Sequence, residues 1–212
     1  MISFLKPEEQ HQHKNGGGWV ANTTFVTDTV YVGPNAWVYG NAQVYGNAQV
    51  SGNARVYGNA RVYGNAQVSG NARVFGDALV SGNAWVSGNA WVYGDAQVSG
   101  NARVFGDALV SGDAQVSGNA RVYGNAQVSG NARVFGDALV SGDAWNTSPL
   151  YIQGTRHSIT NCAKGKLAIG CIVLTFAEWK NQYKKIGKEQ GYTPAQIKEY
   201  KAIIDFAVKT GH

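Results

Sequence analysis

The segment VYGNAQVYGNAQVSGNARVYGNARVYGNAQV, residues 38–68, repeats one six-residue unit five times. The unit reads Val, then Tyr, Ser or Phe, then Gly, then Asn or Asp, then Ala, then a variable residue. Outward from this segment, valine stands at position 20 and at every sixth position up to Val140, 21 times in all. The series ends where Asn146 replaces the next valine. Helices and coiled coils lack a six-residue period, whereas solenoids of short stacked units have one.

The alternation of side chains along a strand assigns a place to each position of the unit. Alanine and the valine two residues later point to one side of the chain, and the variable residue between them points to the other. We therefore expect alanine and valine to form the core and the variable residues to face outward. Glycine with asparagine or aspartate is expected at a corner that needs a left-handed backbone conformation. Alanine leaves space only for a narrow core, which a coil of three units would have.

Repeats such as VYGNAQV at residues 38–44 resemble the hexapeptide repeat of left-handed parallel β-helices. The resemblance implies three flat faces per coil and a left-handed course, an exception to the usual right-handed crossover. The 21 units would make about seven coils, roughly 34 Å long at the usual strand spacing. The predicted fold class is therefore mainly β, a left-handed parallel β-helix of about seven triangular coils with a small α+β C-terminal domain.

Changes of composition divide the chain into three predicted parts. Residues 1–18 are a polar, irregular lead-in, in which His11 and His13 are interpreted as disordered polar residues rather than metal ligands. Residues 19–146 are the β-helix, whose first units depart from the consensus as end-shielding repeats do. Residues 147–212 are a C-terminal α+β domain that would close the open end of the solenoid.

Within the C-terminal domain, residues 150–152 and 166–174 are predicted strands. Thr175 and Glu178 form a capping box that opens a predicted helix over residues 176–190, and Pro194 opens a second helix. The second helix has an apolar stripe made of Ile197, Tyr200, Ile203, Ile204 and Ala207.

The order of small motifs in this domain is similar to the terminal module that follows hexapeptide solenoids in some phage and prophage proteins. The matching motifs are Gly170-Cys171, Thr175, Glu178-Trp179 and Gly191-Tyr192. This resemblance spans about 60 residues and implies no chemistry.

Residues 18 apart should lie above one another, so outward side chains should form columns. The aromatic columns would be Tyr39, Tyr57, Phe75 and Tyr93, then Tyr45 with Tyr63, and Phe105 with Tyr123. Rings and arginines together could hold an anionic ligand such as a nucleotide. The alternative, which we favour, is that the rings stack on one another and support the sheet. The candidate ligand-binding residues are Arg55, Arg61, Arg73, Arg103, Arg121, Arg133, Tyr39, Tyr57 and Tyr93.

Three aspartates, Asp77, Asp95 and Asp113, should also lie in one column, at a corner. Carboxylates about 5 Å apart repel one another, so a bound cation would relieve them. Exposed aspartates are tolerated at turns, so no metal site is predicted here. The aspartate column is only a weak candidate for a metal site.

Many members of the hexapeptide family transfer acyl groups from a thioester cofactor, and the resemblance implies that this activity needs a histidine base and loops that leave the coil. No histidine lies between Lys14 and Arg156, and no insertion interrupts the units. His157, in the C-terminal domain, is the remaining candidate base. We therefore predict that the protein is not an enzyme and needs no cofactor.

The net charge of +5 comes from the C-terminal domain, because the solenoid holds six arginines, no lysine and seven aspartates. A nearly neutral solenoid disfavours nucleic acid as a partner. The sequence shows no signal peptide and no membrane span, so we expect a soluble protein in the cytoplasm of a bacterial host. Cys162 and Cys171 are expected to be reduced, although a disulfide between them stays open, and Cys171 is interpreted as a buried structural thiol.

These observations predict a non-catalytic scaffold or binding protein of phage or prophage origin. A homotrimer is expected, because four tryptophans would face outward and burial between subunits would account for them: Trp37, Trp85, Trp91 and Trp145. One alternative is sequestration of an anionic small molecule in clefts between subunits, and another is acyl transfer through His157. A protein partner is also open.

Overall fold

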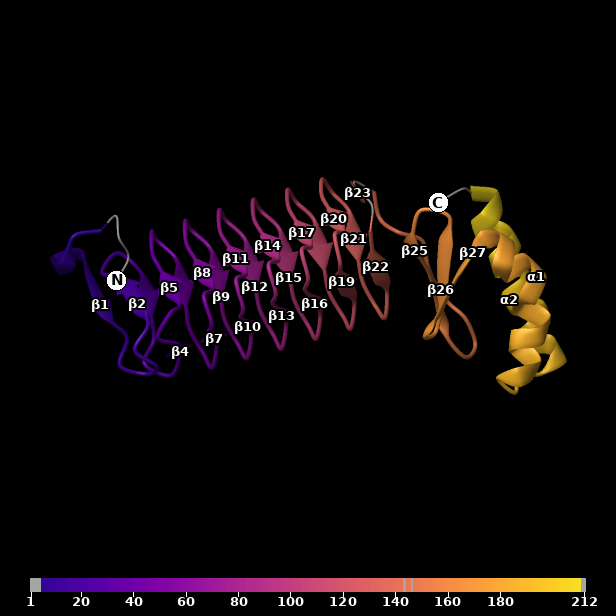
Figure 1. The fold of residues 1–212 in the computed structure, drawn as a ribbon, viewed down its shortest axis with the longest axis horizontal. Coiled ribbons are helices and arrows are strands. Elements are labelled where there is room, and N and C mark those ends of the chain that lie inside the picture. The colour runs from indigo at the N-terminus through magenta and orange to yellow at the C-terminus, as the bar shows by residue number, and fades with distance from the viewer. Residues whose placement is uncertain (1–4, 143, 146, 211–212) are drawn as a thin grey trace.

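The computed structural model describes residues 5–142, 144–145 and 147–210. Asn146, where a domain boundary is predicted, lies outside these residues, and so does His212. The molecule is a long rod in which an N-terminal cap, a solenoid and a C-terminal domain follow one another (Figure 1). The predicted fold class is confirmed: the protein is a β-solenoid of about seven coils, followed by a small antiparallel sheet and two helices.

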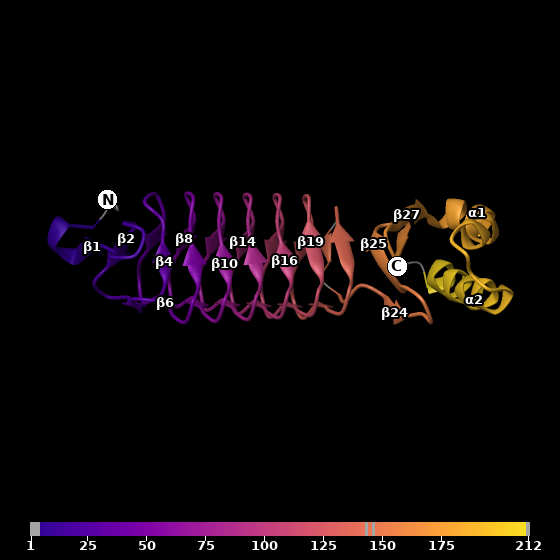
Figure 2. The same cartoon turned by 90° about the horizontal axis from the view of Figure 1, so that it is seen from below.

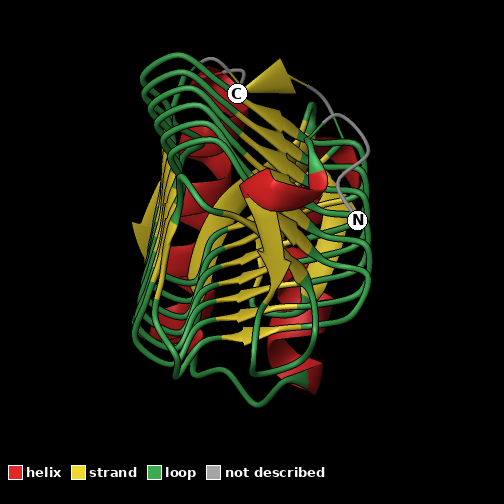
Figure 3. Ribbon diagram, turned by 90° about the vertical axis from the view of Figure 1, so that its left-hand side faces the viewer, coloured by secondary structure: helices red, strands yellow, loops and turns green. Residues whose placement is uncertain are grey.

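Three parallel sheets form the walls of the solenoid, and Figure 3, which looks from the N-terminal end, shows them joined by looped corners. Sheet A also carries one antiparallel strand, β1, at its N-terminal edge. The strands of sheet A are β1 (Gln10–Gln12), β2 (Trp19–Ala21), β5 (Trp37–Val38), β8 (Arg55–Val56), β11 (Arg73–Val74), β14 (Trp91–Val92), β17 (Leu109–Val110), β20 (Gln127–Val128) and β23 (Ala144–Trp145).

The other two walls contain seven strands each. Those of sheet B are β3 (Phe25–Val26), β6 (Gln43–Val44), β9 (Arg61–Val62), β12 (Leu79–Val80), β15 (Gln97–Val98), β18 (Gln115–Val116) and β21 (Arg133–Val134). Those of sheet C are β4 (Tyr31–Val32), β7 (Gln49–Val50), β10 (Gln67–Val68), β13 (Trp85–Val86), β16 (Arg103–Val104), β19 (Arg121–Tyr123) and β22 (Leu139–Ser141).

The core of the solenoid is a stack of alanine and valine. From Ala36 to Val140 every alanine and valine of the repeat is fully buried, as the alternation predicted. Strands pair with partners 18 residues away, for example Val74 with Val56 and Val92. Each coil therefore buries its small apolar face only against its neighbours, which is how a solenoid without a globular core holds together.

Glycine and asparagine have different roles at the corners. The corner glycines have positive φ, for example +68° at Gly88, and no other residue type among the described residues does. The expectation that asparagine shares this conformation is therefore wrong. Asparagine instead forms ladders, in which the side-chain Nδ2 donates to the Oδ1 atom 18 residues later; the longest runs from Asn47 through Asn65, Asn83, Asn101 and Asn119 to Asp137.

The aspartate column interrupts one of these ladders. Asn59 donates to Asp77 at 3.1 Å. A carboxylate has no hydrogen to pass on, and Asp77, Asp95 and Asp113 occupy successive levels, all exposed. We expect Asp95→Asn to raise stability by about 1 kcal/mol, because it can donate to Asp113 and removes the central charge. Chemical unfolding of both proteins at low and high salt would measure this gain.

A matched control is Asp107→Asn, in a column where Asn89 donates to Asp107 at 2.9 Å and Asn125 follows. This change also adds a donor but relieves no neighbouring carboxylate. The gain for Asp95→Asn should exceed that for Asp107→Asn at low salt, and the difference should shrink at high salt. Equal gains at both salt concentrations would show that repulsion in the column is negligible.

The N-terminal segment forms a cap instead of the expected irregular lead-in. A short 3-10 helix, η1 (Pro7–Glu9), precedes β1, which pairs with β2 in antiparallel fashion. His13 is only 5% exposed, and Lys14 forms an ion pair with Asp28. The expectation was wrong because an added strand covers the edge of the first coil, and a cap of this kind needs few apolar residues.

The C-terminal end of the solenoid shifts register by one residue. Val128 pairs with Trp145, whereas the unbroken spacing of 18 would pair it with residue 146. A shift of one residue exchanges the two faces of a strand. Trp145 is consequently 8% exposed and belongs to the core. The prediction that Trp145 faces outward is wrong for this reason.

The C-terminal domain covers the end of the last coil (Figures 1 and 2). The Arg133 amide donates to Ser148 Oγ at 2.9 Å, and the Asp137 amide donates to the Tyr151 hydroxyl at 3.4 Å. These oxygens take amide hydrogens that the carbonyls of a further coil would otherwise accept. These hydrogen bonds attach the C-terminal domain to the last coil.

The domain consists of a four-stranded antiparallel sheet and two helices. The predicted strand over 166–174 is divided by a turn, and one strand of the sheet, β25, was not predicted. Both helices and the Thr175 capping box are confirmed, and hydrogen bonds from Thr175 lower the pKa of Glu178. The elements are β24 (Tyr151–Gln153), β25 (Ser158–Ala163), β26 (Lys166–Ile169), β27 (Ile172–Thr175), α1 (Phe176–Glu189) and α2 (Pro194–Thr210).

Candidate functional sites

The six solenoid arginines do not form one site. Each is the outward residue of its strand, as predicted. The strands, however, belong to different walls: Arg55 and Arg73 lie on sheet A, Arg61 and Arg133 on sheet B, and Arg103 and Arg121 on sheet C. A ligand held by all six is therefore excluded within one chain.

Three of these arginines lie over tryptophan rings of the neighbouring coil. The guanidinium carbon is 4.7 Å from the ring centroid for Arg55 over Trp37, 4.8 Å for Arg73 over Trp91 and 5.6 Å for Arg103 over Trp85. Cation–π contacts of this kind contribute about 0.5–1 kcal/mol at exposed sites. They give the outward tryptophans a partner inside the chain, although Trp85 and Trp91 stay 40% and 37% exposed.

The predicted aromatic columns are present. Tyr39, Tyr57, Phe75 and Tyr93 stack with ring centroids 4.8 to 5.0 Å apart and nearly parallel planes. This spacing equals the strand spacing, so a ligand ring cannot insert between them. Burial in the stack raises the pKa of Tyr39 and of Tyr57. The column therefore fits the supporting role better than ligand binding.

A first hollow lies near the N-terminal end, on sheet A and its adjoining corner. Its volume is about 510 Å³, and its walls are largely amide side chains with the Arg55–Trp37 pair. The lining residues are Trp19, Pro34, Asn35, Trp37, Asn53, Arg55 and Asn71. Two of the amides, Asn53 and Asn71, are already bonded to each other at 3.0 Å.

A larger hollow lies where the last coils of sheet C meet the C-terminal domain, and we call it the junction groove. Its volume is about 680 Å³. The floor comes from the solenoid and the roof from the C-terminal sheet and the loop before β25. The floor residues are Phe105, Asn119, Arg121, Tyr123, Asp137 and Leu139, and the roof residues are Gln153, Arg156, His157, Ser158, Gly170, Cys171 and Val173.

Helix α2 fixes the loop that forms the roof. The buried Tyr200 hydroxyl accepts from the Arg156 amide at 3.1 Å and donates to the His157 carbonyl at 2.8 Å. Glu199 accepts from the Thr155 amide at 2.9 Å. Gly154 is needed here, because a Cβ atom would come within 2.6 Å of the Tyr200 hydroxyl. The roof is therefore preformed.

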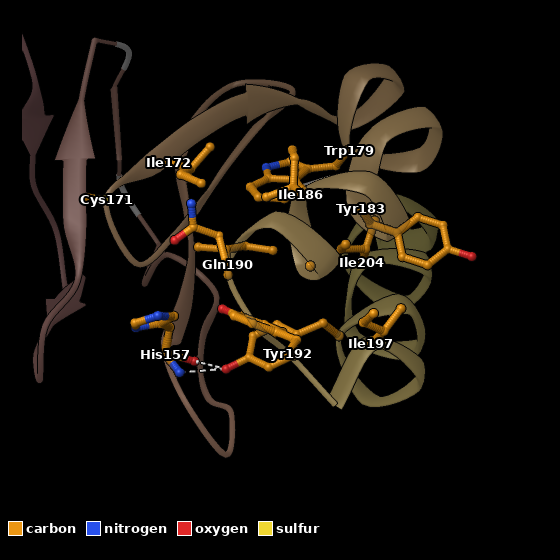
Figure 4. Close-up of a pocket in the computed structure, with 13 residues that line it drawn as sticks. His157, Cys171, Ile172, Trp179, Tyr183, Ile186, Gln190, Tyr192, Ile197 and Ile204 are labelled. Atoms are coloured by element: carbon orange, nitrogen blue, oxygen red, sulfur yellow. Dashed lines mark hydrogen bonds between the residues drawn. The ribbon is translucent and has the colours of Figure 1, made fainter. Parts of the chain in front are cut away.

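A smaller cavity lies inside the C-terminal domain, between the sheet and the two helices (Figure 4). Its volume is about 40 Å³, and apolar residues such as Trp179 and Ile204 line most of it. Trp179 donates to the Leu167 carbonyl at 2.9 Å. This space is close to that of a few waters, so we interpret it as a packing gap in the domain core.

The two cysteines are free, so the disulfide that the sequence left open is not formed. Cys162 is fully buried in β25, and burial raises the pKa of its thiol. Cys171 is exposed. The interpretation of Cys171 as a buried thiol is wrong, because residues 170–171 form the turn between β26 and β27 at the roof of the junction groove.

Within the described ranges, no group of three or more His, Cys, Asp or Glu side chains is arranged to hold a metal ion. The aspartate column is present as a column of exposed corners, and it does not form such a group. No helix among the described residues is both long and apolar enough to cross a membrane.

The geometry places the solenoid in the class of hexapeptide-repeat β-helices, and comparison with known proteins agrees. A family model described as YdcK beta solenoid repeat matches residues 48–64, 54–68, 66–82, 78–94, 96–112, 114–130 and 126–142. The solenoid therefore fits the hexapeptide-repeat left-handed β-helix family that the sequence predicted. Among curated proteins, none matches this chain.

One similar solved structure comes from Bacillus cereus and carries the description "putative acetyltransferase". It shares 13% sequence identity with this chain, and the match covers 88% of this chain and 91% of that protein. The TM-score is 0.37. At this level of similarity, the match carries no inference about activity.

Proposed function

We propose that this chain is a non-catalytic β-solenoid scaffold that assembles as a homotrimer through sheet A. The supporting observation is the row of large side chains on the outer surface of that wall. Strand pairing places Trp19, Trp37, Arg55, Arg73, Trp91 and Leu109 directly beside one another in this order. Tryptophan and arginine are enriched in protein–protein interfaces.

The charge of the solenoid is compatible with a second copy of this chain as the partner that packs against sheet A. The solenoid holds six arginines against seven aspartates, so two solenoids side by side repel little. The Arg–Trp contacts hold the row of side chains in place before association, which lowers the entropy cost of binding. Three copies packed in this way would form a closed assembly about a threefold axis.

The geometry adds nothing to the acyltransferase alternative. The single candidate base, His157, lies in the C-terminal domain and the repeats contain no histidine. We propose no cofactor. The phage or prophage origin and the cytoplasmic location remain part of the proposal. The resemblance of the C-terminal motifs supports that origin.

The test is the molar mass in solution of the full chain and of Trp91→Glu, by sedimentation or light scattering over a range of concentrations. We expect a trimer for the unchanged protein and a shift towards monomer for the variant, because Trp91→Glu replaces an exposed ring of the sheet A row with a carboxylate. The matched control is Gln97→Glu, which adds the same charge to the next strand, on sheet B. A monomeric unchanged protein at all concentrations would contradict the proposal.

A further inference from the structure

The junction groove has the volume of a small-molecule site. Ligand pockets usually measure about 300–1,000 Å³, and this groove measures about 680 Å³. It crosses sheet C from the corner at Asp137 to the end of β19 at Tyr123. Its roof is held by the hydrogen bonds of Tyr200 and Glu199, so little ordering is needed when a ligand enters.

Two arginines make the groove receptive to an anion. Arg121 is exposed and pairs along sheet C with Arg103 of the preceding coil, whose guanidinium lies over Trp85. Among the ion pairs of the described residues, none includes Arg121 or Arg156. Arg156 donates to the Gly191 carbonyl at 3.0 Å and lies over the Tyr192 ring. That contact fixes the guanidinium and leaves it further N–H groups to donate.

The end of an aromatic column provides a place for a ring. Phe105 and Tyr123 stack with centroids 5.5 Å apart and planes 11° apart. The next position of this column, paired with Tyr123, is Ser141, so among the residues that the structure describes this aromatic column ends at Tyr123. A planar group of a ligand can stack against Tyr123 at the floor of the groove, as nucleobases stack on aromatic side chains.

A carboxylate at the other end completes the arrangement. Asp137 accepts from Asn119 at 2.9 Å and is exposed, so it can also accept from a hydroxyl group. His157 lies at the roof, with its ring packed beside Gly170, where an added Cβ would be 3.1 Å from it. Figure 4 shows this ring on the side of the domain away from the helices.

We propose that the junction groove binds a small phosphorylated compound with a planar ring, of the nucleoside monophosphate type. Arg121 and Arg156 bind the phosphate, Tyr123 stacks with the ring, and Asp137 accepts from a hydroxyl group. Guanidinium groups recognise phosphate through paired hydrogen bonds, which suits this charge pattern. The site lies within one chain and does not depend on the proposed trimer, so either proposal can fail alone.

The test is isothermal titration calorimetry of the full chain with adenosine monophosphate, uridine monophosphate and phosphotyrosine. Inorganic phosphate and adenosine serve as part probes. We expect at least one of the three compounds to bind once per chain and roughly tenfold or more tightly than either part probe, because only the whole compound uses both ends of the groove. If none binds more tightly than inorganic phosphate, the proposal is overturned.

Two pairs of variants locate the site. Arg121→Gln should weaken binding of the whole compound roughly tenfold or more, since it removes a charged donor. Arg61→Gln, at the same position of the repeat on sheet B, should leave binding unchanged. Tyr123→Ala should weaken the whole compound but not inorganic phosphate, and Tyr63→Ala, the end of the Tyr45–Tyr63 stack, should change neither. Equal losses for Arg121→Gln and Arg61→Gln would show non-specific binding and overturn the assignment.

Discussion

Trp145→Ala should cost about 3–5 kcal/mol of stability at the C-terminal end of the solenoid. The side chain takes the place of a valine on the inner face, where it lies against the last coil and is 8% exposed. Tyr151 packs against the same core. Removal of the ring would leave a cavity at the junction of the solenoid and the C-terminal domain, because the alanine and valine side chains of the last coil are too small to fill it. Chemical unfolding followed by circular dichroism would measure the loss.

Hydrogen exchange would show where this loss falls. Solenoid stability is a sum of units and nearest-neighbour interfaces, so protection should fall first around β20 and β24 and least around β5. The control is Trp85→Ala, which removes a ring that is 40% exposed on sheet C. Its cost should be about 1–2 kcal/mol, because the variant loses the contact with Arg103 and the hydrogen bond that the Trp85 indole donates to Ser69 Oγ at 3.1 Å. Similar costs for both variants would argue that Trp145 does not support the core.

The orientation of Trp145 shows where a repeat pattern stops being sufficient. The valine period predicts the inner face of all seven coils, because small apolar side chains at one spacing have a single way to be buried together. At the end of the series the same period would place the amide of Asn146 in the core, which costs free energy. That conflict was a signal for a register shift. The alternation rule alone could not show its direction.

The C-terminal domain was predicted less well than the solenoid, because it has no repeat. Its helices carry capping residues and an apolar stripe, which are local signals. Strand β25 reads SITNCA, a mixture of polar and apolar residues, and the structure buries Thr160 and Asn161 within it. Asn161 accepts from the Leu150 amide, so its burial serves an irregular chain connection. No periodic pattern marks such a strand.

The junction groove could not be predicted from the sequence either. Columns predict which side chains are neighbours on one wall, and they correctly place Phe105 under Tyr123. They do not predict that Arg156 and His157 line the same groove as Arg121, because that depends on how a separate domain is attached. Of the nine predicted ligand-binding residues, the groove contains only Arg121. Of the other eight, Arg55 lines the N-terminal hollow, and Tyr39, Tyr57 and Tyr93 belong to the first aromatic column.

Gly118→Ala should destabilise the solenoid by about 3 kcal/mol, and Gly124→Ala, six residues later, by only about 1–2 kcal/mol. Both glycines have positive φ, +70° and +63°, so alanine pays the same conformational cost at each. At Gly118 an added Cβ would also lie 2.8 Å from the Gly136 amide nitrogen, and forcing the coils apart costs about 1–3 kcal/mol more.

The contrast between these two glycines arises from the register shift at Trp145. The register changes directly after Gly124, since Tyr123 pairs with Ser141 but Val128 pairs with Trp145, and an added Cβ at Gly124 would meet nothing within 4 Å. Chemical unfolding of the two variants compares stacking with backbone strain in the same coil. If both lose the same free energy, contact between stacked corners does not limit this solenoid, and glycine is required only for its backbone conformation. A larger loss of unfolding free energy for Gly118→Ala means that the repeat needs glycine for two reasons, the backbone conformation of the turn and the close approach of the next coil.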